Sequence, residues 1–482
     1  MTDIMGFSFG SSTLGGTYSR DEMFADNWML AAEMTTQKLS MIHLFKLGLL
    51  KPDQITKLKK AFKTLSETKI EVLPETWDAQ STIQETLGKI LNNQDLLDIL
   101  YGAEHWNDLL STTMALYTRE SLAIISEASL TSIKTLIDWC RSQNSTYYYG
   151  TSHTGQPTEI TTLGHFFAAY IPTLIESAEH MLHLAENIQS PHGSHNAWGV
   201  VAGPNREYFA DLVGMKCSSH SGYGLTNRTQ QAVDILSTFH KITAQFNHIK
   251  FIIIEMKNRK HITIPREFCS NSEMEPYRQK PEGVENFGRI HSYIQSFLSQ
   301  ALACVNEGQT PGFNNQDSVS KIALVKGFVI MLEAFGKFNT LIPGIQANHE
   351  EIQTTLDELP FFYNNNFVQL LVREKKVSFP SAKKTVLEAM KVSQEGGKNR
   401  ITFESINNAL GENGQVSEEE INNWQNPAWL VSQKTETGLA GNLINDLTHA
   451  ETKLGELSAK NTALKNTISK SLSRIENTLE EM

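Results

Sequence analysis

Apolar residues recur every three or four positions along most of this chain, and runs of alternating apolar and polar residues are rare. Because that spacing places apolar side chains on one face of a helix, it predicts a mainly helical protein. Pro52 begins one amphipathic helix, since proline is tolerated in a first helical turn. The longest predicted helices span residues 108–143, 163–189, 229–257, 284–307 and 318–341.

These long helices leave little room for a wholly polar face, which predicts a bundle covered on several sides, in part by other chains. Shorter helices are predicted before and after them. We therefore divide the chain into an N-terminal helical domain (1–106), a central long-helix bundle (107–348) and a C-terminal helical domain (349–482). A near-heptad stripe of leucine and isoleucine along the last forty residues predicts a helix that packs against the same or a neighbouring subunit.

Composition narrows the class of protein. The chain has 482 residues, 40% of them hydrophobic, and a net charge of -11. That balance argues against a nucleic-acid-binding surface or a polybasic membrane patch. The N-terminus has no signal-peptide pattern and no apolar run reaches the roughly 20 residues of a membrane helix. Four scattered cysteines without metal-type spacing fit a reducing cytoplasm, so we expect a cytoplasmic protein with no metal.

One polar segment, residues 264–286, interrupts the helical pattern with three prolines and a glycine. It carries Ser272, the acids Glu273 and Glu275, and the cations Arg278 and Lys280. A polar loop between rigid helices can hold catalytic groups over a cleft. The alternative is a solvated connection between two helices.

Two further polar stretches lie at the ends of long helices. In GAEHWNDLL (102–110), Asn107 and Asp108 stand at a helix start, where such residues often serve only as caps. In the stretch 151–170, a turn precedes a helix and can present His153, Thr154 and Gln156 to an anionic ligand. The alternative for His153 is an ordinary hydrogen-bonded histidine.

Several motifs carry a family resemblance. GQPTEITTLG (155–164) is similar to a segment of adenylosuccinate lyases, and residues 190–215 resemble a stretch of argininosuccinate lyases. The segment 264–286 resembles the signature Gly-Ser-Ser-x-Met-Pro-x-Lys-x-Asn-Pro of the fumarase/aspartase superfamily, and residues 370–390 and 426–441 resemble the C-terminal domain of argininosuccinate lyases. On these motifs the chain resembles the fumarase/aspartase superfamily, and most closely its argininosuccinate lyases.

The resemblance implies an all-α, three-domain fold of the L-aspartase type, whose long helices form a twenty-helix core in a homotetramer with active sites built from three subunits. It also implies a small-molecule substrate of the succinyl-amine type, no cofactor, and an anti elimination that releases fumarate. Because the substrate is a dianion that gains further negative charge, cations and amides must surround it.

The signature transfers roles to single residues of the segment 264–286. Ser272 takes the place of the family's proton-abstracting serine, Arg278 the place of its lysine, and Lys280 the place of its substrate-binding asparagine. Glu285 is also assigned to substrate binding. If one residue is instead inserted before Pro276, Ser272 becomes the second serine of the signature.

The other two stretches depart from the family. Without a gap, His153 and Thr154 invert its Thr-His pair, whereas treating Gly155 as an insertion restores His153 to the histidine position. Asn107 and Asp108 match the end of the motif Arg-Ser-Arg-Asn-Asp, but both arginines are absent. His153 and Thr154 join Ser272 as the predicted catalytic residues. Asn107, Asp108 and Gln156 complete the predicted substrate-binding set.

Two functions therefore stay open. The first is a carbon–nitrogen lyase with altered substrate or weak activity. The second is an inactive paralogue that keeps the tetrameric scaffold for binding or assembly, because the family's histidine is displaced and both arginines are absent. If Glu273 or Glu275 points into the site, about 6 Å from the base, its carboxylate would oppose the required charge by roughly 2 to 3 kcal/mol. If these acids point to solvent, screening removes most of that penalty.

Overall fold

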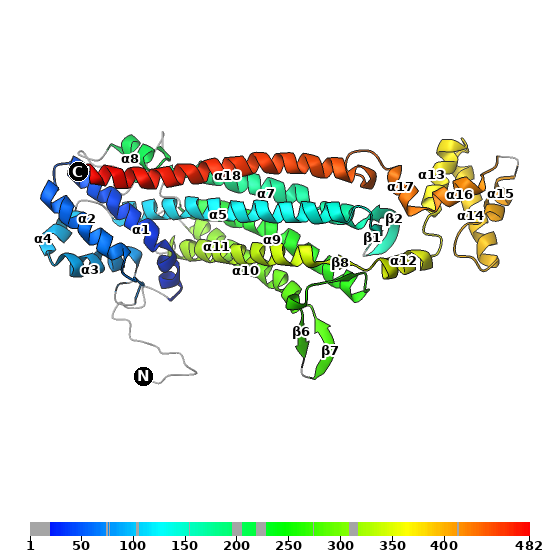
Figure 1. The fold of residues 1–482 in the computed structure, drawn as a ribbon, viewed down its shortest axis with the longest axis horizontal. Helices are drawn as coiled ribbons and strands as arrows, with labels where there is room; N and C mark the ends of the chain where they lie inside the picture. The colour runs from blue at the N-terminus through cyan, green and yellow to red at the C-terminus, as the bar shows by residue number, and fades with distance from the viewer. Residues whose placement is uncertain are drawn as a thin grey trace.

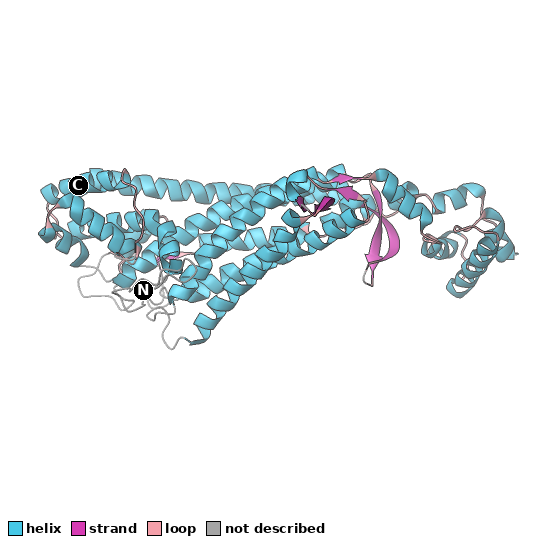
Figure 2. Cartoon of the chain, turned by 90° about the horizontal axis from the view of Figure 1, so that it is seen from below, coloured by secondary structure: helices cyan, strands magenta, loops and turns pink. Residues whose placement is uncertain are grey.

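The computed structural model describes residues 20–73, 76, 78–102, 106–153, 155–194, 205–217, 228–272, 274–307, 317–411 and 414–482. Within these ranges the fold is mainly helical, as the sequence predicts, and the strands are short (Figures 1 and 2). The three-domain division of the chain stays a prediction.

Four helices gather at one end of the elongated molecule (Figure 1). They are α1 (Arg20–Lys46), α2 (Pro52–Ser66), α3 (Ala79–Leu91) and α4 (Gln94–Gly102). Pro52 does begin α2, and the Asp78 side chain caps α3 by accepting a hydrogen bond from the Ser81 amide. Leucine and isoleucine side chains from these helices form a separate apolar cluster that also includes Ile475 and Leu479 from the last helix.

Long helices make the body of the molecule. They are α5 (Trp106–Ser142), α7 (Ile171–Glu186), α9 (Arg228–Asn258), α10 (Glu282–Glu307) and α11 (Asp317–Leu341), with the short helices α6 (Leu163–Ala168) and α8 (Arg206–Leu212). The single helix predicted over residues 163–189 is two helices, because Pro172, in the first turn of α7, cannot donate the backbone hydrogen bond that would continue α6. Phe246 and Phe338 stack at 4.4 Å between α9 and α11, deep in the core.

Short strands connect the long helices at four places. Hairpins form between β1 (Tyr147–Ser152) and β2 (Gln156–Thr162), and between β6 (Ser270–Ser272) and β7 (Glu275–Lys280). β3 (Gln189–Ser190) pairs with β4 (Lys216–Cys217) in parallel, and β5 (Ile262–Thr263) pairs with β8 (Gln346–Ala347) in antiparallel.

A group of shorter helices lies beyond the far end of the long helices (Figure 1). It comprises α12 (His349–Glu358), α13 (Asn364–Glu374), α14 (Phe379–Glu395), α15 (Phe403–Leu410), α16 (Glu418–Trp424) and α17 (Pro427–Ser432). Phe367 and Trp424, both buried, pack edge to face at the centre of this group.

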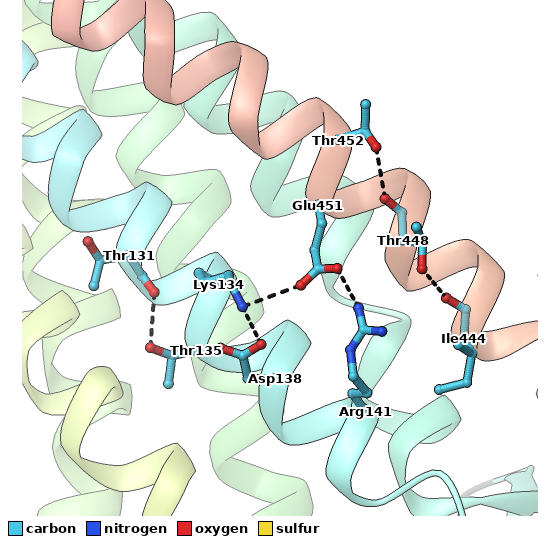
Figure 3. Close-up of polar contacts among 9 residues, drawn as sticks. All are labelled: Thr131, Lys134, Thr135, Asp138, Arg141, Ile444, Thr448, Glu451 and Thr452. Carbon is cyan, nitrogen blue, oxygen red and sulfur yellow. Dashed lines mark hydrogen bonds and ion pairs between the residues drawn. The ribbon is translucent and has the colours of Figure 1, made fainter.

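The last helix, α18 (Leu443–Glu480), does not stay with that group. It runs back along α5 and α7 to the N-terminal helices, so its leucine stripe packs against the same chain (Figure 1). Ion pairs fasten it to α5: Glu451 lies 2.5 Å from Arg141 and 3.3 Å from Lys134, and Lys134 also pairs with Asp138 (Figure 3). The chain therefore passes the length of the bundle once more at its end.

Candidate functional site

The polar segment 264–286 folds as the hairpin β6–β7, which projects from the side of the bundle (Figures 1 and 2). Ser270 pairs with Lys280 and Ser272 with Glu275, with an irregularity between Asn271 and Ser272. The exposed fractions of Met274 and Tyr277 are 90% and 85%, so the tip of the hairpin stands in solvent. The side chain of Ser272 and the whole of Glu273 lie outside the described residues.

Both cations of the hairpin lie beside an acid of the same strand. Arg278 donates to the Glu275 carboxylate at 3.1 Å, and the Lys280 Nζ is 4.0 Å from it. The Glu275 carboxylate therefore lies against these two cations and does not point freely to solvent. Glu285, in the first turn of α10, is exposed.

His153 lies on the turn between β1 and β2. Its φ is 42°, in the left-handed region that non-glycine residues seldom adopt, and Gly155 follows with φ 94°. The His153 Nδ1 is 3.1 Å from the Ser152 hydroxyl oxygen. Gln156 is exposed at the start of β2, and Thr154 lies outside the described residues. The tight turn thus holds the imidazole at the tip of a hairpin.

A polar network beneath this turn was not predicted from the sequence. Arg259, just after α9, donates from Nη1 to the Tyr149 hydroxyl at 2.8 Å and pairs with Glu255 at 2.9 Å. The buried His261 lies 3.0 Å from the Tyr148 hydroxyl through Nδ1. Burial, and then the charge of Arg259, lower the pKa of His261, so its ring is neutral at physiological pH. The only sequence signal was the triple tyrosine at 147–149.

Both hairpins lie beside the last turns of α9. A Glu255 carboxylate oxygen would be 3.7 Å from a β-carbon added at Gly155, on the turn of the first hairpin. Lys257 donates from Nζ to the Gln279 carbonyl oxygen of the second hairpin at 2.9 Å. The structure therefore brings the His153 turn and the Ser272 segment to the same end of one helix.

Asn107 and Asp108 stand at the opposite end of α5. Asp108 is 2% exposed and its carboxylate accepts hydrogen bonds from the amides of Gly193 and Ser194, at 2.7 and 2.9 Å, and from the Ser194 hydroxyl. α5 has 37 residues and is thus about 55 Å long, with β1 beginning just after its far end. One chain does not bring Asn107 and Asp108 together with His153.

Within the described ranges, no group of three or more histidine, cysteine or acidic side chains could hold a metal ion. None of the described helices is both long and apolar enough to cross a membrane.

Comparison with known proteins shows which proteins the chain is similar to. No family model matches the chain. The chain is 21% identical to the argininosuccinate lyase of Thermotoga neapolitana over 338 residues, which covers 67% of the chain and 82% of that enzyme. It is also 21% identical to the argininosuccinate lyase of Methanocaldococcus jannaschii, with 86% of each covered. The chain is thus similar in sequence to argininosuccinate lyases, which are members of the fumarase/aspartase superfamily.

The fold agrees with that likeness. The structure of EDDS lyase in complex with formate superposes with a TM-score of 0.77 at 14% identity and covers 97% of this chain and 96% of that one. The superfamily resemblance read from the motifs is thereby confirmed, as is the all-α fold.

Proposed function

We propose that this protein is a carbon–nitrogen lyase that releases fumarate from an N-succinyl-type substrate. The observation that carries the proposal is the placement of the His153 turn and the Ser272 hairpin at the same end of α9, in a chain that resembles this superfamily. Its relatives include argininosuccinate lyases and EDDS lyase, which support carbon–nitrogen bond cleavage.

In the proposed reaction the Ser272 hydroxyl, as the alkoxide, removes a proton from the carbon next to one substrate carboxylate. The electron pair left on that carbon forms the double bond of fumarate as the bond between the neighbouring carbon and nitrogen breaks, and the leaving nitrogen takes a proton that His153 donates. His153 is the partner for proton transfer. Arg278 and Lys280 bind the substrate carboxylates, with Gln156 and Glu285 at the margin of the site.

We further propose that copies of the chain assemble into a homotetramer whose sites combine residues from several copies. The length of α5 supports this, because Asn107 can reach the hairpins only of another copy. Exposed apolar side chains on one face of α1, α5 and α11 also support it: Trp28, Ile124 and Leu332 line a hollow of about 210 Å³ there.

The four free cysteines favour the reducing cytoplasm as its location. We leave Asp108 out of the substrate-binding set, because both of its carboxylate oxygens already accept hydrogen bonds within the chain.

The second candidate is an inactive paralogue that keeps the scaffold for binding or assembly. The position of Glu275 favours it, since this carboxylate lies beside both cations that would bind the substrate dianion. In that case Glu275 neutralises the charges of Arg278 and Lys280, and the hairpin does not bind an anion.

A fumarate-release assay separates the two candidates. The wild-type chain is offered a panel of N-succinyl amines that includes argininosuccinate and EDDS, alongside Ser272→Ala and a matched surface variant, Ser299→Ala on α10. We expect turnover of at least one substrate by the wild type and Ser299→Ala, and its loss in Ser272→Ala. Turnover that survives Ser272→Ala would remove this serine from the mechanism, and no turnover of any substrate would favour the inactive paralogue.

A further inference from the structure

The helices α1, α2 and the end of α18 come together at the end of the molecule far from the two hairpins (Figure 1). A hollow of about 510 Å³ lies where they meet. We call it the lysine pocket, because Lys38 of α1 and Lys59, Lys60 and Lys63 of α2 line it. Its volume falls in the usual range of small-molecule sites, roughly 300 to 1,000 Å³.

Two of the four lysines have an evident structural role. Lys38 pairs with Glu476 at 2.5 Å. Lys59 donates to the Leu479 carbonyl oxygen at 2.9 Å and lies 3.3 Å from Glu480. Cations at a helix C-terminus stabilise its unpaired carbonyl groups, so these two lysines hold the end of α18 against the N-terminal helices.

Lys60 and Lys63, the other two lysines, do not contact the end of α18 through such pairs. Lys60 and Lys63 are exposed, and within the described part of the chain neither ammonium group has an ion pair or a hydrogen bond. Because they are three residues apart on α2, they lie on the same face of the helix. The pocket thus gathers four ammonium groups around two carboxylates, in a chain whose net charge is -11.

We propose that the lysine pocket binds a small phosphorylated anion, with its phosphoryl oxygens between Lys60 and Lys63. A phosphoryl group carries up to two charges and three acceptor oxygens on one compact centre, so it can accept from both ammonium groups at once. Phe62 and Met41 give the pocket an apolar wall as well, which would suit an anion with an organic part. Glu476 and Glu480 repel the anion, which keeps its affinity moderate. The proposal is independent of the lyase activity, because it uses none of the hairpin residues.

Calorimetric titration of the full chain with inorganic tripolyphosphate tests the proposal. We expect saturable binding of one tripolyphosphate per chain, and at least about tenfold weaker binding by the double variant Lys60→Gln/Lys63→Gln, since each lost charged contact weakens binding several-fold. Lys383→Gln/Lys384→Gln on α14, two exposed lysines, changes the net charge equally and is expected to bind as the wild type does. Glu480→Gln removes a repelling carboxylate and is expected to bind more tightly.

Two further measurements make the outcome decisive. The thermal midpoint of the wild type should rise with tripolyphosphate and that of the double variant should not, while their midpoints without the anion should agree because both side chains are exposed. Citrate, a carboxylate anion of similar charge, should bind at least tenfold more weakly than tripolyphosphate. Absence of tripolyphosphate binding, equal loss in the Lys383/Lys384 control, or citrate binding of equal strength would each overturn the proposal.

Discussion

Arg278 donates from Nη1 to both carboxylate oxygens of Glu275, at 3.1 and 3.3 Å, so one acid and one cation of the proposed site lie against each other. Both side chains are partly exposed, and such pairs contribute about 1 kcal/mol or less to stability. The contact therefore bears on binding of the substrate more than on folding.

We expect Glu275→Gln to lower the KM for a dianionic substrate several-fold, because it removes a negative charge beside Arg278 and Lys280. Fumarate formation at several substrate concentrations measures this. Glu395→Gln, on the exposed surface of α14, is the matched control. An unchanged or higher KM in Glu275→Gln would argue that the two cations do not bind the substrate.

The separation of Asn107 from His153 predicts complementation between variants. Asn107→Ala and His153→Ala are each expected to lose most of their activity. If the two chains are unfolded and refolded together, on the order of a quarter of the sites should receive both native residues and regain activity. The measurement is fumarate release by the mixture against each variant refolded alone. A mixture no more active than its parts would contradict a site shared between copies.

Asp108 is expected to act on stability. Asp108→Ala leaves three buried donors of the 193–194 turn without an acceptor, which should lower the free energy of unfolding by about 3 kcal/mol. Chemical denaturation measures this change. Asp138→Ala removes an exposed acid of the same helix and should cost less than about 1 kcal/mol. Equal effects of the two substitutions would show that the Asp108 contacts contribute little.

The pKa of Glu33, on α1, predicts how the free energy of unfolding depends on pH. This side chain is 1% exposed and accepts hydrogen bonds from Gln37 and Thr113, yet burial raises its pKa to about 7. The folded chain therefore holds a proton that the unfolded chain releases near pH 4.5. Its contribution to stability, about 3 kcal/mol, is fully present below pH 4.5 and is lost as the pH rises through 7.

Glu33→Gln should remove this dependence, because glutamine keeps the shape of the protonated acid and does not titrate. Denaturant unfolding at pH 5 and pH 7.5 measures it, with Glu395→Gln as a control that keeps the wild-type slope. The same slope in Glu33→Gln as in the wild type would mean that Glu33 is ionised in the folded chain.

The spacing of apolar residues predicted the long helices, each of which buries one face along its length. The helix predicted over 229–257 is α9, Arg228–Asn258, and the helix predicted over 108–143 is α5, Trp106–Ser142. The two hairpins were missed, because their strands are short and mix polar with aromatic residues, so no alternation marks them. The segments read as polar connections are in fact paired strands that hold His153 and Ser272 in place.

Motif resemblance identified the candidate residues, but it could not predict which of them lie next to each other. Whether Glu275 faces solvent or a cation depends on the bulged register of β6 and β7, which spacing does not determine. Arg259 and His261 were missed for a similar reason: they act on β1, more than a hundred residues earlier in the chain.

Because α18 returns along the bundle, its last turns pack against the N-terminal helices. Leu479 and Ile475 lie in the apolar cluster of the N-terminal helices, and Lys59 binds the last turn of the helix. Removing the last two turns of α18 would uncover that cluster, and a segment fused directly to the end of α18 would begin beside the lysine pocket. Tags for work on this protein therefore belong on neither α18 nor its end.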